Sequence, residues 1–100
     1  MAEPGRSWTF LTSHGVVLIE VFRNPEATVR EISERAQLTE RQAHRVLGDL
    51  VTEGYLMRER VGRRNRYRVN ETQQMRHPAI AAHRIGELLA ALAPPPQASR

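Results

Sequence analysis

The sequence contains no cysteine, no lysine and no long apolar run. Without cysteine the chain has neither a disulfide nor a thiolate metal site. The longest apolar run, residues 16 to 22, is interrupted by Glu20, whereas a membrane span needs about 18 residues. The first residues do not form the apolar stretch of a signal peptide. We therefore expect a cytoplasmic protein.

The chain is long enough for one domain and too short for two domains with proper cores. Hydrophobic residues make up 40% of it, which is ordinary for a globular protein and too many for a disordered one. The net charge is +4, and all fifteen basic residues are arginine. Either the planar arginine fork is needed to bind phosphate or guanine, or the genome favours arginine codons. The positions of the arginines are therefore more informative than their number.

Three amphipathic helices are predicted in the first half of the chain. The first runs from residue 12 or 13 to about residue 22 and is stopped by Asn24-Pro25. The second covers residues 28 to 36, and Gln37-Leu38 form a tight connection to the third. Hydrophobic residues three and four positions apart give each helix one apolar side.

The third helix has clear boundary signals. Thr39 to Gln42 has the S/T-x-x-E/Q form of a capping box, which predicts the start. Gly54 predicts the end, because glycine enters the left-handed region without penalty. The apolar stripe between them consists of Ala43, Val46, Leu47, Leu50 and Val51.

A hairpin follows the third helix. Residues 55 to 61 and 66 to 69 predict its two strands, with residues 62 to 65 as the turn. In the second strand, arginines alternate with Tyr67 and Val69. This alternation predicts one apolar face and one cationic face.

The order of elements predicts a mainly α fold with a small β-hairpin wing (α+β), a winged helix-turn-helix with a C-terminal dimerisation helix. Residues 70 to 77 are polar and predict an irregular connector, and Pro78 suits the first turn of the last helix. The predicted organisation is a flexible lead-in (1–7), a winged helix-turn-helix DNA-binding domain (8–70), a connector and dimerisation helix (71–93) and a flexible tail (94–100).

The side of the third helix opposite its apolar stripe carries residue types that suit DNA. Arginine fits guanine, glutamine fits adenine, and threonine contacts a phosphate or a thymine methyl. A solvated helix face often holds the same types, but this one lies between a tight helix–helix turn and an arginine-rich hairpin. Glu40 argues the other way, because it repels phosphate unless it is paired or caps the helix. The candidate DNA contacts are Thr39, Arg41, Gln42, His44 and Arg45.

The hairpin sequence RERVGRRNRYRV, residues 58 to 69, contains six arginines and one acid. A solvated loop can carry this charge, but beside DNA the crowding becomes favourable because counterions are released. Asn65 suits either a base contact or the turn, and the turn is the stronger of the two interpretations. The candidate DNA contacts of the wing are Arg63, Arg64, Asn65 and Arg66.

Catalytic and cofactor patterns are missing from the sequence. It has no cysteine nucleophile, no glycine-rich phosphate loop and no serine motif at a strand–helix turn. The four histidines lack the i, i+4 spacing of a helical metal site, although His77, His83 and Glu87 leave a site across a dimer seam open. We expect no enzyme, no cofactor and no metal.

Apolar segments near both ends of the sequence predict a homodimer. The last helix has an apolar stripe, and WTFL at residues 8 to 11 needs a surface to bury against. Each can pack on its own domain or on a second copy. A two-fold dimer would place two third helices roughly 34 Å apart, one turn of DNA. The candidate dimerisation residues are Trp8, Phe10, Leu11, Ile85, Leu88, Leu89 and Leu92.

The segment from Thr28 to Asn70 resembles the winged helix-turn-helix of the MarR and ArsR families of prokaryotic transcription regulators. It is especially similar to small single-domain regulators with the pattern LTERxAxRxxxDLxxxGYLxRxRVGRRNRY, followed by RHP and a GELL-like segment. The resemblance implies that the third helix and the wing contact DNA and that the first and last helices form a dimer. The chain is shorter than a typical MarR protein and lacks the ArsR cysteines, so neither a ligand cleft nor a metal site is carried over.

The resulting expectation is a sequence-specific, double-stranded DNA-binding transcription regulator located with the nucleoid. It would be a homodimeric repressor, with its third helix in the major groove and its wing on the backbone or minor groove. Two alternatives remain, a winged-helix adaptor that binds a protein and a winged helix that binds RNA. The basic, polar third helix disfavours the adaptor but does not separate DNA from RNA, and the sequence does not indicate whether a small-molecule effector exists.

Overall fold

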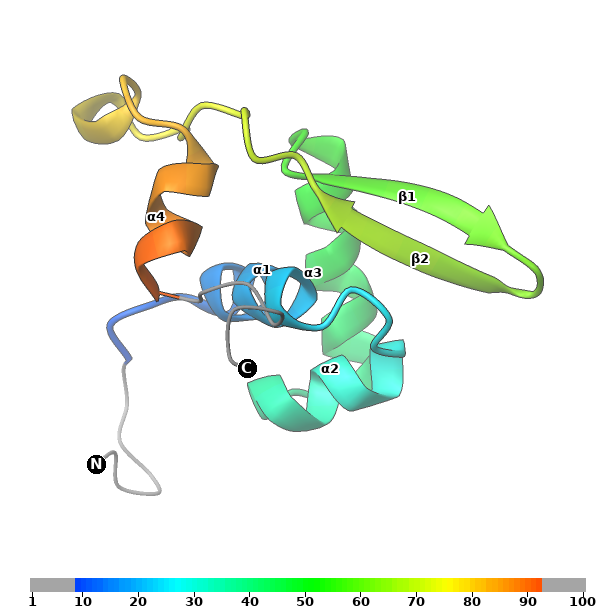
Figure 1. Cartoon of the computed structure of the whole chain (residues 1–100). Coiled ribbons are helices and arrows are strands. Elements are labelled where there is room, and N and C mark those ends of the chain that lie inside the picture. The colour runs from blue at the N-terminus through cyan, green and yellow to red at the C-terminus, as the bar shows by residue number, and fades with distance from the viewer. Residues whose placement is uncertain (1–8, 93–100) are drawn as a thin grey trace, which may run out of the picture.

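The computed structural model describes residues 9–92, which form four α-helices, a short 3-10 turn and a two-stranded antiparallel hairpin (Figure 1). In chain order the elements are α1 (Ser13–Arg23), α2 (Val29–Ala36), α3 (Glu40–Thr52), β1 (Leu56–Val61), β2 (Arg64–Val69), η1 (Pro78–Ile80) and α4 (Ile85–Leu92). The first three helices pack against one another, α4 packs on α1, and the hairpin extends away from the helices. The predicted α+β class is confirmed. No helix in this part of the chain is long and apolar enough to cross a membrane.

Threonine caps determine where the first three helices begin. Of the two predicted starting residues of α1, 12 and 13, Thr12 is the one that caps the helix with its side chain. Thr39 and Gln42 form the predicted capping box at the start of α3. A second capping box, formed by Thr28 and Glu31, starts α2. It has the same sequence form as the first, so the same pattern was sufficient to predict it.

Left-handed backbone residues end α2 and α3. Gln37 has a φ of 60°, and no other non-glycine residue between 9 and 92 has a positive φ. Gly54 has a φ of 89°, which confirms its predicted role. There the Tyr55 N–H donates to the Leu50 carbonyl at 2.9 Å and the Gly54 N–H to the Val51 carbonyl at 3.1 Å. These two bonds form a Schellman motif, which turns the chain from α3 into the hairpin.

One hydrophobic core joins the helices to the base of the hairpin. The predicted apolar stripe of α3 faces this core, except that Val51 is only half-buried. Burying each large side chain contributes roughly 1.5–3 kcal/mol relative to its exposed state. The core therefore fixes both α3 and the root of the hairpin. Its buried members are Val17, Leu18, Val21, Ile32, Val46, Leu47, Leu50, Tyr55, Leu56, Tyr67, Ile85 and Leu89.

The hairpin turn is shorter than predicted. The pairing of β1 with β2 extends to Arg64, so only Gly62 and Arg63 form the turn. Gly62 has a φ of 63° and Arg63 does not have a positive φ, which is the pattern of a type II′ turn. That turn matches the twist of the strands. The predicted four-residue turn is therefore wrong, and Asn65 lies in β2.

The predicted division of the hairpin into an apolar and a cationic face holds only near its base. Tyr67 is buried and Arg68 is exposed, as the alternation requires. However, Arg58 pairs with Tyr67 across the strands, and such partners share a face. Arg66 is half-buried instead of fully exposed. Arginines therefore lie on both faces of the hairpin.

The last α-helix begins later than predicted, at Ile85, and Pro78 opens only the 3-10 turn. Between them the chain pairs with the connector, which is less irregular than expected. The Met75 N–H donates to the His83 carbonyl at 3.0 Å, and the Ile85 N–H donates to the Gln73 carbonyl at 2.8 Å. The second bond satisfies a backbone N–H that the first turn of a helix leaves without an intrahelical partner.

The connector approaches α4 closely at Gly86. A Cβ there would lie 2.9 Å from the Glu71 carbonyl oxygen, whereas a Cβ at Gly48 in α3 would meet nothing within 4 Å. We expect Gly86→Ala to lower the free energy of unfolding by about 1–3 kcal/mol through overpacking. Gly48→Ala, the matched control, should raise it by about 0.5–1 kcal/mol because alanine favours the helix. Urea unfolding measures both values, and a stabilised Gly86→Ala variant would contradict the close approach.

Glu87 caps the first turn of α4. Its carboxylate accepts the Arg84 backbone N–H at 3.0 Å and lies 2.8 Å from the His83 ring. These hydrogen bonds, the backbone one first, lower the pKa of Glu87. A lowered folded-state pKa means that the stabilisation is complete above the usual glutamate pKa and is lost as the pH falls through the lowered value.

We expect Glu87→Gln to lower the melting temperature at neutral pH and to have no effect below the lowered pKa of Glu87. In acid the wild-type carboxyl is also uncharged, so the two side chains become equivalent. Thermal unfolding of both proteins across the acidic range measures the difference. A difference that stays constant with pH would contradict the role of the charged carboxylate.

Candidate nucleic-acid interface

The outward side of α3 displays the side chains that were predicted as DNA contacts. The opposite side of this helix is buried in the core. Within residues 9–92, Arg41, His44 and Arg45 make no side-chain hydrogen bond or ion pair. Their polar groups are therefore available to a ligand. The five exposed candidates are Thr39, Arg41, Gln42, His44 and Arg45.

Two of these five side chains also hold the start of α3. The Thr39 hydroxyl accepts the Gln42 N–H, and the Gln42 side-chain oxygen accepts the Thr39 N–H, each at 3.0 Å. Bidentate recognition of adenine needs both the oxygen and the nitrogen of a glutamine amide. In the capped state one of the two lone pairs of this oxygen is occupied, and the cap fixes the orientation of the amide. The cap therefore restricts base reading by Gln42 to one orientation of its amide.

Acidic side chains border the cationic part of α3. Glu40 lies in the first turn, where the positive end of the helix dipole favours it, and it is not the cap. Asp49 lies near the other end, and its carboxylate is 2.8 Å from the His14 ring of α1. The contact connects α3 to α1. The cationic stretch of α3 is thus confined to its N-terminal half.

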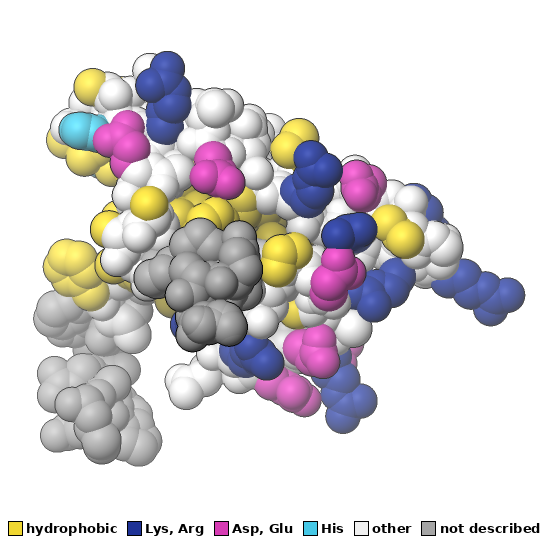
Figure 2. Space-filling model, viewed as in Figure 1, with side chains coloured by type: hydrophobic (Ala, Val, Ile, Leu, Met, Phe, Trp, Pro, Cys, Tyr) yellow, Lys and Arg dark blue, Asp and Glu magenta, His cyan; other side chains and the backbone are white. Residues whose placement is uncertain are grey.

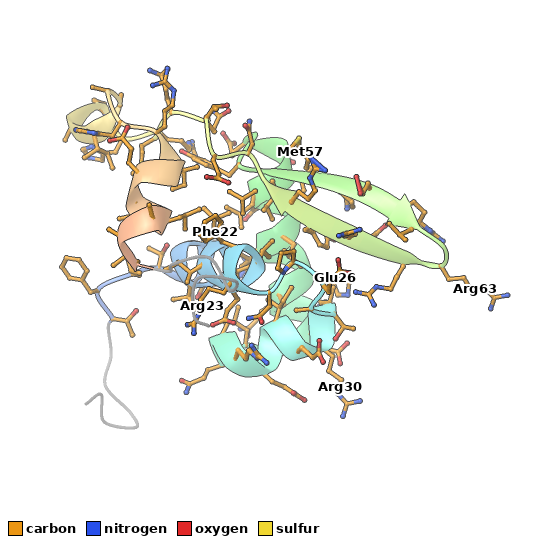
Figure 3. All side chains as sticks on the ribbon, viewed as in Figure 1. Phe22, Arg23, Glu26, Arg30, Met57 and Arg63 are labelled. Carbon is orange, nitrogen blue, oxygen red and sulfur yellow. The ribbon has the colours of Figure 1, made fainter. Side chains whose placement is uncertain are left out.

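The candidate arginines of the hairpin differ in their contacts. Arg63 lies in the turn and projects away from the body of the molecule (Figure 3). Arg64 and Arg66 instead contact the connection between α1 and α2. The Arg64 Nη2 donates to the Glu26 carbonyl at 2.6 Å, and the Arg66 Nη2 donates to the Glu26 carboxylate. Of the three, only Arg63 has no side-chain hydrogen bond or ion pair with another described residue.

Glu26 contacts the candidate interface and was missed by the sequence analysis. It is 40 residues away from Arg66 in the chain, and no local pattern relates the two positions. The Arg66 Nε is buried and has no hydrogen-bond partner in the described part of the chain. Asn65 is exposed on β2, where it pairs with Arg60 of β1. The structure thus brings one acid to the arginine cluster and leaves Asn65 accessible.

Charge is distributed unevenly along the hairpin (Figure 2). On the face shown, acidic and basic side chains are interspersed near the helices, and a basic side chain reaches the free end of the hairpin. Residues 61 to 65, which form this end, include two arginines and no acid. The field of the hairpin is therefore most positive at its tip.

The histidines and carboxylates of the described residues do not gather into a metal site. Among residues 9–92, no group of three His, Cys, Asp or Glu side chains is placed to hold a metal ion. The His77 ring accepts the Ala79 N–H at 3.0 Å, and the His83 ring contacts Glu87. Both histidines considered for a site at a dimer seam thus have local partners.

The predicted dimerisation residues differ in how accessible they are. Ile85 and Leu89 belong to the core of the chain, which withdraws them from a partner in this conformation. Phe10 is 93% exposed and Leu92 is 49% exposed. Leu11 and Leu88 are half-buried, and Trp8 lies outside the described residues.

No family model and no curated protein matches this sequence. The resemblance of residues 28–70 to MarR- and ArsR-type regulators therefore stays a prediction from the motif. The exposed face of α3 and the hairpin are the features from which a function can be inferred.

The cap formed by Thr39 can be separated from any contact that Thr39 makes with DNA. We expect Thr39→Ala to lower the free energy of unfolding by about 1 kcal/mol, because an orphan N–H loses its acceptor. Thr39→Ser keeps the hydroxyl and should retain most of the stability. Urea unfolding of the three proteins tests this. If Thr39→Ala is as stable as the wild type, the hydroxyl does not stabilise α3.

Proposed function

We propose that this chain is a sequence-specific, double-stranded DNA-binding regulator of transcription that acts as a homodimeric repressor. In this proposal α2 and α3 form a helix-turn-helix, and the β1–β2 hairpin is its wing. The observation that carries the proposal is the exposed face of α3. It displays Arg41 and Arg45 directly after a tight helix–helix turn and before a hairpin with Arg63 at its end.

The spacing on α3 suits the major groove, which is about 12 Å wide and admits one α-helix. Arg41 and Arg45 are four positions apart and so lie on one side of the helix, roughly 6 Å apart along its axis. That separation corresponds to about two base-pair steps of roughly 3.4 Å. Gly48, the next residue on this side, has no side chain, and the space beside its Cα is open, so the helix backbone can approach the DNA there.

Two observations favour duplex DNA over the alternative partners. The outward residues of the N-terminal half of α3 are all polar, whereas protein interfaces are enriched in aromatic residues and methionine at their centres. The major groove of RNA is too deep and narrow for side chains to read. A helix that presents arginines for base reading therefore suits DNA better than RNA.

The homodimer rests on the exposed apolar residues near the two ends of the described chain. Phe10 and Leu92 are accessible to a partner, whereas Ile85 and Leu89 serve the core of the same chain. A two-fold arrangement would present two α3 helices to successive major grooves, roughly 34 Å apart. A target site with two related halves at this spacing would follow from that arrangement.

We expect Arg45→Ala and Arg63→Ala to weaken DNA binding in different ways. Loss of Arg45 should cost about 1–3 kcal/mol on the target duplex and little on a scrambled one, because it removes a base contact. Loss of Arg63 should weaken both complexes alike and reduce the salt slope by about 0.9, because it removes a phosphate contact. Fluorescence anisotropy across a salt series measures this, with a target selected from random duplexes.

Arg76→Ala is the matched control, because Arg76 is an exposed arginine on the connector that pairs with Glu53. This variant should bind both duplexes as the wild type does. An RNA of equal length is measured alongside. Absence of binding to any duplex at low salt would overturn the proposal, and tighter binding to the RNA would favour the RNA-binding alternative.

A further inference from the structure

Glu26 binds two of the arginines that the sequence assigns to DNA. It lies in the connection between α1 and α2, where Figure 3 shows it between β2 and α2. Its carbonyl accepts a hydrogen bond from Arg64 and its carboxylate pairs with Arg66. The Glu26 side chain is 69% exposed and that of Arg66 is 34% exposed, so water reaches the acid more readily than the arginine.

Carboxylate and phosphate are equivalent ligands for a guanidinium group, because both present paired oxygens to its N–H donors. Among the described residues, Arg66 has one such ligand, the Glu26 carboxylate. Its Nε is buried without a partner among the described residues, so the guanidinium edge that includes Nε is closed to an approaching phosphate. Glu26 pairs with Nη2 of the same guanidinium group. A DNA phosphate that binds Arg66 through Nη2 therefore competes with Glu26.

We propose that Glu26 is an internal competitor of the DNA backbone and lowers the affinity of the hairpin for phosphate. This inference rests on the proposed function, and it identifies Glu26 as the residue that limits the affinity for DNA. While Arg66 is paired with Glu26, it adds no net phosphate contact, and Arg63 supplies the contact at the free end. The six arginines of the hairpin then overstate the charge that is available to DNA.

Glu26→Gln tests the competition, because it removes the charge and keeps the size of the side chain. We expect tighter binding to the target and the scrambled duplex by the same factor, since phosphate contacts carry no sequence information. One additional phosphate contact steepens the salt slope by about 0.9, so the gain should shrink about 3.5-fold when salt rises fourfold. Anisotropy titrations at several salt concentrations measure both effects.

Two controls separate competition from a general loss of negative charge. Glu59→Gln removes the same charge from β1, directly opposite Arg66, but leaves the pair with Glu26 in place. It should tighten binding less and leave the slope unchanged. In an Arg66→Gln background, Glu26→Gln should tighten binding to either duplex no more than Glu59→Gln does in the wild type. Equal gains from both glutamate variants, or a full gain in the Arg66→Gln background, would overturn the inference.

A readout without DNA distinguishes failure of this inference from failure of the proposed function. The melting temperatures of wild type, Glu26→Gln, Arg66→Gln and the double variant form a cycle, and a real pair makes the two changes non-additive. Additive changes would overturn the inference, whatever the protein binds. A non-additive cycle with no binding to any duplex would overturn the proposed function instead. Weaker DNA binding by Glu26→Gln would show that Glu26 positions the hairpin, which also contradicts competition.

Discussion

The junction at Gly54 and Tyr55 fixes the hairpin relative to α3. Gly54 ends the helix in the left-handed region, and Tyr55 enters the core. The returning end of the hairpin is held at the same place, because Asn70 donates its backbone N–H to the Tyr55 carbonyl and its side-chain N–H to the Gly54 carbonyl. The Tyr55 hydroxyl also donates to the Gln74 carbonyl, so the connector starts from the same junction. The relative position of α3 and the hairpin, the two candidate DNA-binding elements, therefore depends on this junction.

The two residues that cap the start of α3, Thr39 and Gln42, are also candidate DNA contacts. Thr39 and Gln42 exchange two hydrogen bonds that satisfy N–H groups at the helix N-terminus. Arg41 and Arg45 make no side-chain hydrogen bond within the described chain. Recognition by arginine would therefore be independent of the cap, whereas recognition by Gln42 would be restricted to the amide orientation that the cap fixes. Arg41 and Arg45 are for this reason stronger candidates for base reading than Gln42.

Local signals predicted much of the fold, and contacts between distant segments account for what was missed. The box at Thr39 and the glycine at position 54 act through neighbouring backbone groups, so their sequence patterns were sufficient. The late start of α4 depends on hydrogen bonds to the connector, and the pair between Glu26 and Arg66 spans 40 residues. No periodicity in the sequence encodes such contacts. The sequence therefore predicted the residue types of the candidate interface. It did not predict which of the arginines are paired with an acid of the same chain.

Nearby acids allow the free protein to accommodate the arginine run of the hairpin. Antiparallel pairing places Glu59 opposite Arg66, and Glu26 lies on the helical side of β2. Arg63 points into solvent, where the high dielectric constant and salt weaken its repulsion from the other arginines. The run is thus compatible with folding before any polyanion is bound. The number of arginines in the run does not give the number of DNA contacts, because nearby acids determine how many of these arginines are free to bind phosphate.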